Sequence, residues 1–116
     1  MNKSSLTSGK ALFNGTAEGL LKSSNGKYTL RMQKDGDLVV YQQQLKGEDI
    51  PIWASRTDNT EGQQPFRLEM QWDNDLCIYD GEHKLIWASR TRGRGKAGAW
   101  VTLEVKNTLI ESKMLT

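Results

Sequence analysis

The stretch Tyr28-Thr-Leu-Arg-Met-Gln-Lys-Asp-Gly-Asp-Leu-Val-Val-Tyr41 has a second version later in the chain, Phe66-Arg-Leu-Glu-Met-Gln-Trp-Asp-Asn-Asp-Leu-Cys-Ile-Tyr79. The two stretches align without gaps at a constant offset of 38 residues. Each is followed by the same hexapeptide, Ile52-Trp-Ala-Ser-Arg-Thr57 and Ile86-Trp-Ala-Ser-Arg-Thr91. A repeat of this length indicates one supersecondary unit used more than once. We therefore expect repeated units at about residues 28–57 and 66–91.

The interval between the repeated tyrosine and tryptophan differs between the copies, with eleven residues in the first and seven in the second. The first copy thus carries a four-residue insertion within residues 42–51, which predicts a longer loop there. A degenerate third copy is predicted at about residues 101–110, where Val101-Thr-Leu-Glu-Val-Lys106 precedes Asn107-Thr-Leu-Ile110. This third copy lacks the aspartates and the tyrosine of the other two.

Apolar residues alternate with polar ones inside each copy, as in Tyr28, Leu30 and Met32. This period of two is typical of half-buried strands. Asp35-Gly36 and Asp73-Asn74 separate the alternating runs, and both pairs tolerate the positive φ of tight hairpin turns. The pattern predicts about a dozen short strands without an amphipathic helix, and hence an all-β protein that closes by repetition.

The length of 116 residues predicts a single domain over residues 1–116. Sixteen lysines and arginines against fourteen acidic residues give a net charge of +2, which does not favour a nucleic-acid partner. The densest basic stretch contains Arg90, Arg92, Arg94 and Lys96 and alternates with small polar residues. We expect this stretch to be a solvated loop.

The single cysteine, Cys77, excludes an intramolecular disulfide. The N-terminal residues contain no apolar run of signal-peptide length, and no segment approaches the roughly 20 apolar residues that span a membrane. These features predict a soluble protein without membrane insertion, either cytoplasmic or exported by a non-classical route.

The odd-numbered residues of each repeated motif are predicted to share one face of a hairpin, with the apolar even-numbered residues on the other. An amide, two carboxylates, a phenol and a small apolar side chain suit a pyranose, which needs hydrogen-bond partners for its hydroxyls and an apolar floor for its C–H face. The candidate residues are Gln33, Asp35, Asp37, Val39 and Tyr41 in the first copy and Gln71, Asp73, Asp75, Cys77 and Tyr79 in the second.

The two copies, QKDGDLVVY and QWDNDLCIY, resemble the motif QxDxNxVxY of the monocot mannose-binding, or bulb-type, lectins. The segment Leu6-Thr-Ser-Gly-Lys-Ala-Leu12 is similar to that family's opening strand, and the Ile-Trp-Ala-Ser segments also match it. The resemblance covers roughly residues 5–110. It implies a β-prism II fold of three antiparallel sheets with pseudo-threefold symmetry, with one shallow mannose site for each intact motif.

The resemblance also implies roles for the motif residues. In that family, the motif glutamine contacts the sugar's 3-hydroxyl region, the first aspartate contacts the axial 2-hydroxyl, and the tyrosine contacts the 4-hydroxyl. These roles fall to Gln33, Asp35 and Tyr41 and, in the second copy, to Gln71, Asp73 and Tyr79. Val39 supplies the apolar contact, and Cys77 replaces that valine. Asp37 and Asp75 replace the family's asparagine, and an ionised carboxylate accepts hydrogen bonds but cannot donate them.

The same residues also allow other chemistry. The pairs Asp35/Asp37 and Asp73/Asp75 could indicate a metal site or a glycosidase, but each flanks a tight turn without a third acidic ligand nearby. His83 is the only histidine and is predicted to lie in an exposed loop, which nearly excludes a Ser/His/Asp triad. Cys77 is expected to pack in a strand and not to act as a nucleophile. We expect no metal, no cofactor and no enzymatic activity.

The tryptophans are predicted to have two different roles. Trp53 and Trp87 occupy equivalent places in the repeats and are expected to be core residues near the pseudo-axis. Trp72 stands beside the second motif, where the first copy has Lys34, and could border the second sugar site.

The leading hypothesis is a lectin with two sites for mannose or for high-mannose glycans on glycoproteins. A homodimer is expected, because the family often exchanges C-terminal strands and the tail carries the apolar residues Leu109, Ile110 and Met114. Multivalency also strengthens binding through shallow sites. The alternative is a protein-interaction or toxin-like prism module with vestigial sugar sites.

Overall fold

The computed structural model describes residues 5–7, 9–15, 19–58, 62–90, 100–106 and 109–115, the last two ranges by their backbone. Within these ranges the chain forms strands and turns and contains no helix, so none that could cross a membrane, which confirms the prediction of an all-β protein. The strands are β1 (Ser5–Thr7), β2 (Ala11–Phe13), β3 (Leu20–Lys22), β4 (Tyr28–Met32), β5 (Leu38–Gln42), β6 (Ile50–Ala54), β7 (Arg67–Met70), β8 (Leu76–Tyr79), β9 (Leu85–Ala88), β10 (Trp100–Lys106) and β11 (Leu109–Leu115).

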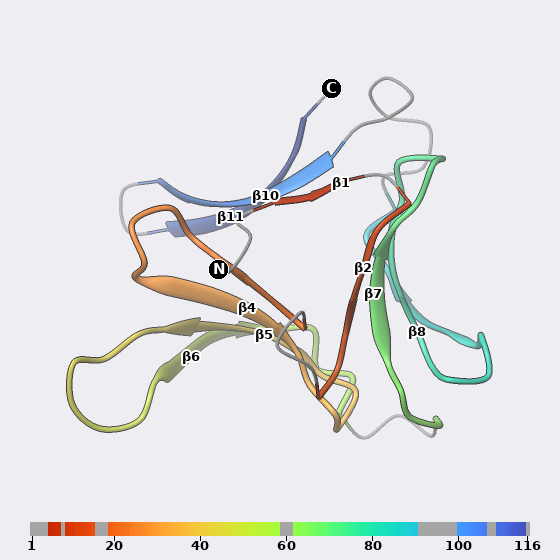
Figure 1. Ribbon diagram of the computed structural model, residues 1–116, viewed down its shortest axis with the longest axis horizontal. Helices are drawn as coiled ribbons and strands as arrows, with labels where there is room; N and C mark the ends of the chain where they lie inside the picture. The colour runs from red at the N-terminus through yellow and green to blue at the C-terminus, as the bar shows by residue number, and fades with distance from the viewer. Residues whose placement is uncertain are drawn as a thin grey trace.

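The strands form three antiparallel sheets that surround a common interior (Figure 1). One sheet has the order β3-β4-β5-β6 and a second has the order β2-β7-β8-β9. The third has the order β1-β10-β11, and its β10–β11 hairpin covers the residues at which a degenerate third copy is predicted. Each sheet thus combines one short strand from the N-terminal part of the chain with consecutive antiparallel strands from further along it, three in the first two sheets and two in the third.

The first two sheets repeat the same local structure. In one, Met32 pairs with Leu38 across the β4–β5 turn, and in the other Met70 pairs with Leu76 across the β7–β8 turn. The register also shifts at the same point in both, immediately before Tyr41 and immediately before Tyr79. The two motifs therefore reach the same backbone geometry in separate sheets.

The core lies between the sheets and contains the even-numbered apolar residues, as the alternation predicts. Leu38 and Val40 of β5 belong to it, whereas Val39 does not. The core cluster consists of Leu6, Leu12, Leu21, Leu30, Met32, Leu38, Val40, Phe66, Leu68, Met70, Leu76 and Ile78. Burial of this apolar surface is the dominant favourable contribution to folding.

Residues 6–12, which resemble one opening strand, form two strands in two different sheets. β1 pairs with β10, whereas β2 pairs with β7. Gly9 adopts a φ of 80° between them, and Lys10 N donates to Thr7 O at 3.0 Å. This left-handed residue turns the chain, so that Leu6 and Leu12 reach the core from two different sheets.

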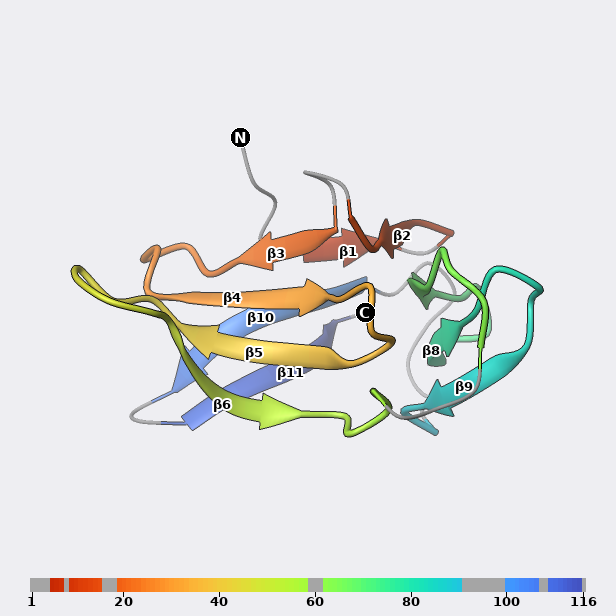
Figure 2. The ribbon, with the colours of Figure 1, turned by 90° about the horizontal axis from the view of Figure 1, so that it is seen from below.

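The insertion predicted in the first copy forms the loop between β5 and β6, which extends away from the sheets (Figure 2). Leu45 in this loop is fully exposed, and His83, in the shorter β8–β9 loop, is exposed as predicted. Most of the basic stretch, including Arg92, Arg94 and Lys96, lies outside the described residues, whereas Arg90 is exposed.

The prediction that Trp53 is a core residue is wrong. Its side chain is 45% exposed, although its ring meets that of Trp87 edge to face, with centroids 6.4 Å apart. Trp87 is partly buried and packs against the core cluster. The equivalent positions differ in burial although β6 and β9 are both edge strands of their sheets, and residues 50–53 of β6 are all exposed.

Asp80 fixes the β8–β9 loop to the segment that precedes β7. Its Oδ1 accepts hydrogen bonds from Lys84 N at 2.8 Å and Glu82 N at 2.9 Å, and its Oδ2 accepts one from Gln63 N at 3.2 Å. The hydrogen bond from Lys84 and those from the other two amides hold the pKa of Asp80 below its ordinary value of 3.8. A lowered pKa means that folding favours the ionised form.

We expect Asp80→Asn to lower the melting temperature at pH 7, because the side-chain NH2 would face a backbone N–H donor. The native carboxylate stabilises the fold above pH 3.8, and this contribution is lost as the pH falls below that value. The difference in melting temperature between wild type and variant should therefore shrink on acidification. Circular dichroism melts at pH 7, 5 and 3 measure it, and a constant difference would contradict the assigned role.

Candidate functional site

Each motif forms a tight hairpin turn that begins at its glutamine. Gln33 N donates to Asp37 O at 3.0 Å and Gly36 N donates to Gln33 O at 3.1 Å. The second motif has the same pair of bonds, from Gln71 N to Asp75 O and from Asn74 N to Gln71 O. Gly36 has a φ of 89° and Asn74 a φ of 71°, as the turn residues predict.

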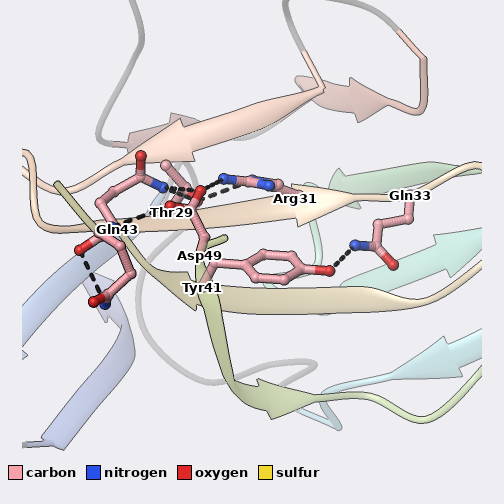
Figure 3. Close-up of polar contacts among 7 residues, drawn as sticks. Thr29, Arg31, Gln33, Tyr41, Gln43 and Asp49 are labelled. Atoms are coloured by element: carbon pink, nitrogen blue, oxygen red, sulfur yellow. Dashed lines mark hydrogen bonds and ion pairs between the residues drawn. The ribbon is translucent and has the colours of Figure 1, made fainter. Parts of the chain in front are cut away.

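The glutamine and the tyrosine of each motif meet on the outer face of the sheet. Gln33 Nε2 donates a hydrogen bond to Tyr41 Oη (Figure 3), and Gln71 Nε2 donates one to Tyr79 Oη. Burial raises the pKa of the Tyr79 phenol, so its hydroxyl keeps its proton at neutral pH. Each pair thus holds a phenolic O–H and an amide carbonyl side by side, one a donor and the other an acceptor.

The first aspartate of each motif shapes its turn. Asp35 Oδ1 accepts a hydrogen bond from Asp37 N at 2.9 Å, and Asp73 Oδ1 accepts one from Asp75 N at 3.0 Å. A side chain that bonds to the backbone two residues on forms an Asx turn. This bond fixes the direction of a carboxylate that is exposed in Asp35 and partly exposed in Asp73.

Asp37 connects the first motif to the end of β6. Its Oδ1 accepts hydrogen bonds from Ser55 Oγ at 3.0 Å, Arg56 N at 2.9 Å and Thr57 N at 3.3 Å. An asparagine would present the same oxygen, so aspartate in its place leaves these bonds intact. The exchange alters the second terminal atom of the group, from an NH2 donor to a carboxylate oxygen.

The second motif repeats this connection with Asp75 and Ser89. Ser89 Oγ donates to Asp75 Oδ1 at 3.0 Å and accepts a hydrogen bond from Leu76 N at 3.0 Å. Ser55 Oγ likewise accepts one from Leu38 N at 3.0 Å. The serine of each Trp-Ala-Ser segment therefore ties the motif to the strand that follows it.

Val39 and Cys77 lie on the outer face but are covered by neighbouring side chains. They are 4% and 2% exposed. Their cross-strand neighbours are Arg31 and Ala54 for Val39 and Glu69 and Ala88 for Cys77. Burial raises the pKa of the Cys77 thiol to about 12, so the thiol is neutral, as expected for a packing role.

An arginine stacks on each motif tyrosine, from a different position in each sheet. Arg31 lies 4.3 Å from the centre of the Tyr41 ring, and Arg67 lies 4.7 Å from that of Tyr79. Arg31 is diagonal to Tyr41 in the β4–β5 register, whereas Arg67 is directly opposite Tyr79. Such cation–π contacts restrict the ring orientation and so help to fix the position of the hydroxyl.

The inserted loop is attached to the first site through Asp49 (Figure 3). Asp49 Oδ2 accepts hydrogen bonds from Arg31 Nη2 at 2.6 Å and Gln43 Nε2 at 3.0 Å, and Oδ1 accepts one from Gln44 N at 3.1 Å. The bond from Arg31 is the main cause that holds the pKa of Asp49 below its ordinary value. The insertion thus forms a polar border that is specific to the first site.

The arrangement provides donors and acceptors for neutral hydroxyl groups. Among the residues that the structure describes, no three His, Cys, Asp or Glu side chains form a group that could hold a metal ion. The carboxylates of each motif are committed to turn and strand contacts through one oxygen, and the amide–phenol pair lies on the same face. This geometry suits hydrogen bonding to a polyol.

Comparison with known proteins identifies the family. A mannose-specific lectin of Aloe arborescens is 32% identical over 84 residues, which cover 72% of this chain and 70% of that lectin. The chain belongs to the bulb-type lectin family. In agreement with the sequence-based prediction, this is a family of sugar-binding proteins without catalytic activity.

Two further comparisons define the extent of the likeness. The mannose-specific agglutinin of snowdrop (Galanthus nivalis), solved with methyl-α-D-mannoside, superposes with a TM-score of 0.76 at 29% identity and covers 98% of this bulb-type lectin chain and 90% of the agglutinin. This confirms the β-prism II fold. Comitin of Dictyostelium discoideum is 41% identical over 85 residues, which cover 72% of this chain. The chain spans about half of comitin, since the match covers 45% of it. No family model matches the chain.

Several residues of this bulb-type lectin that support the motifs were not identified from the sequence. Ser55 and Ser89 belong to the repeated Trp-Ala-Ser segment, and their repetition was a usable signal. Arg31, Arg67 and Asp49 carried no such signal, because they occupy different positions in the two copies or occur in only one. Their roles depend on cross-strand register and on the path of the inserted loop.

Proposed function

We propose that the chain binds mannose or mannose-containing glycans through two sites, one for each motif, without converting the sugar. The observation that carries the proposal is the same hydrogen-bond framework in both motifs, with a Gln–Tyr pair and an Asx-turn aspartate on the outer face of a sheet. Preorganised polar groups of this kind fix the orientation of a ligand. The mannose specificity named for the Aloe and snowdrop proteins supports the choice of sugar.

The proposed contacts follow the motif. Gln33 and Gln71 bond to the 3-hydroxyl region and Asp35 and Asp73 to the axial 2-hydroxyl. Tyr41 and Tyr79 bond to the 4-hydroxyl. Val39 and Cys77 form the floor beneath, and Asp37 and Asp75 offer a carboxylate oxygen where the family motif has an amide. Since each sugar hydroxyl donates one hydrogen bond, an acceptor there is compatible with binding.

A glycan array probed with and without a chelator tests the proposal. We expect signals on mannose-terminated and high-mannose glycans that the chelator leaves unchanged. No signal on any glycan would overturn the proposal and favour a protein-interaction or toxin-like prism module with vestigial sugar sites.

We also propose that the protein is a homodimer. Edge strand β6 exposes Ile50 and Ile52, and edge strand β9 exposes Leu85. β11, which carries the apolar tail residues, is an edge strand of the third sheet. Unpaired strand edges readily pair with a second copy, and two copies would double the number of shallow sites.

Multi-angle light scattering measures the mass directly, and we expect about twice the chain mass of 13.1 kDa. A mass of 13.1 kDa across the micromolar to millimolar range would contradict the dimer.

A further inference from the structure

A hollow of about 430 Å³ lies next to the first motif. It is lined by Gly19 and Leu20 at the start of β3, by Arg31 and Met32 of β4, and by Gln33, Lys34 and Asp35 of the turn. Its volume falls within the roughly 300–1,000 Å³ typical of ligand sites. Gln33 and Asp35 line both this hollow and the proposed mannose site, so a ligand can extend from one into the other without leaving the surface.

The lining of the hollow suits a second sugar residue. Gly19 has no side chain, and the partly exposed Leu20 offers an apolar surface to the C–H face of a pyranose. The exposed ammonium group of Lys34 is a donor for ring hydroxyls. Arg31 is held in place by Asp49 and Tyr41, so it forms a fixed wall.

The second sheet differs at the corresponding place. Lys10 O accepts a hydrogen bond from Met70 N at 3.0 Å, just as Gly19 O accepts one from Met32 N, so Lys10 corresponds to Gly19. Trp72 replaces Lys34 in the turn. Its indole lies directly against Gly9, since a Cβ added to Gly9 would be 2.9 Å from Trp72 Nε1 and 3.0 Å from Cζ2.

These replacements change the side chains that border the second site. Where the first site is bordered by an arginine, a lysine and a glycine, the second is bordered by Glu69, Trp72 and Lys10. The bulky indole lies against Gly9, the neighbour of Lys10, whereas the described residues at the corresponding place in the first sheet, Gly19 and Leu20, line the hollow. A second sugar residue adds affinity only where its new contacts exceed the cost of ordering it, and an indole on the rim leaves less room for such contacts.

We propose that the two sites differ in the length of glycan they bind: the first motif site and its hollow hold two linked sugar residues, whereas the Trp72 indole restricts the second site to one terminal residue. This proposal rests on the proposed function. It makes Lys34 and Trp72, which hold equivalent places in the repeat, the residues that determine specificity.

Variants with a single working site test the proposal. Asp73→Ala leaves the first site and Asp35→Ala leaves the second. Each is titrated by calorimetry with methyl α-D-mannoside and with α-linked mannobiose. We expect mannobiose to bind about tenfold more tightly than the monosaccharide at the first site, a difference of about 1.4 kcal/mol. At the second site we expect the two affinities to agree within about twofold.

A second substitution locates the cause. Lys34→Trp in the Asp73→Ala background should reduce the tenfold preference for mannobiose to that of the second site. Lys46→Trp, which adds an exposed tryptophan in the β5–β6 loop, is the control and should preserve the preference. Equal ratios at the two sites, or a ratio unchanged by Lys34→Trp, would overturn the inference. Failure of wild type to bind either sugar would instead overturn the proposed function.

Discussion

The double variant Asp35→Ala/Asp73→Ala is expected to lose mannose binding, and each single variant is expected to bind with half the wild-type stoichiometry. Each aspartate is assigned to the 2-hydroxyl of one sugar. A hydrogen bond that involves a charged partner contributes about 1.5–3 kcal/mol, so its loss weakens an already shallow site by tenfold or more. Isothermal titration calorimetry with methyl α-D-mannoside measures both affinity and stoichiometry.

The structure also shows what these substitutions do to the fold. Asp35 Oδ1 and Asp73 Oδ1 each accept a backbone hydrogen bond, at 2.9 Å and 3.0 Å, which alanine removes. We expect each alanine variant to lose about 0.5–1.5 kcal/mol of stability and to remain folded. Asp35→Asn and Asp73→Asn keep the accepting oxygen and serve as matched controls for the turn. Wild-type stoichiometry in the double alanine variant would show that the site assignment is wrong.

Truncation of the interior is expected to have the largest effect on stability. Leu68 and Ile78 are both 0% exposed and belong to the core cluster between the sheets. Replacing either by alanine removes buried methyl groups and leaves a cavity, which typically costs about 2–5 kcal/mol. For a domain of this size, such a loss is a large fraction of the total stability.

Trp53→Ala provides the contrast. The side chain of Trp53 is 45% exposed, so we expect its removal to cost less than either core truncation. Trp87→Ala should lie between the two, because Trp87 packs against the core while remaining partly exposed. Urea denaturation monitored by circular dichroism gives the free energies of unfolding. If Trp53→Ala destabilised the protein as much as Leu68→Ala, the observed burial would not govern stability here.

The sequence by itself determined the all-β class, the turn positions and the core face of the repeated hairpins. The alternation of apolar residues identified Leu38 and Val40 as core, and the Asp-Gly and Asp-Asn pairs identified turns that reach positive φ at Gly36 and Asn74. These features depend on residues close together in the chain. The position of the inserted loop was also predictable, because the two copies could be compared with each other.

The surroundings of the motif residues were decided only by the tertiary structure. The pattern placed Val39 and Cys77 on the outer face, but whether they are covered depends on side chains from neighbouring strands. The same holds for the bonds that Asp37 accepts from residues 55–57 and for the contact of Arg31 with Tyr41.

Two expectations about neighbouring segments show the same limit. β1 and β2 belong to two different sheets because Gly9 turns the chain between them, and Trp53 is 45% exposed whereas its repeat equivalent Trp87 packs against the core cluster. A periodic pattern reports which face of its own strand a residue occupies. It carries no information on which other strand lies against that face, because that is settled by the joint packing of three sheets around one core.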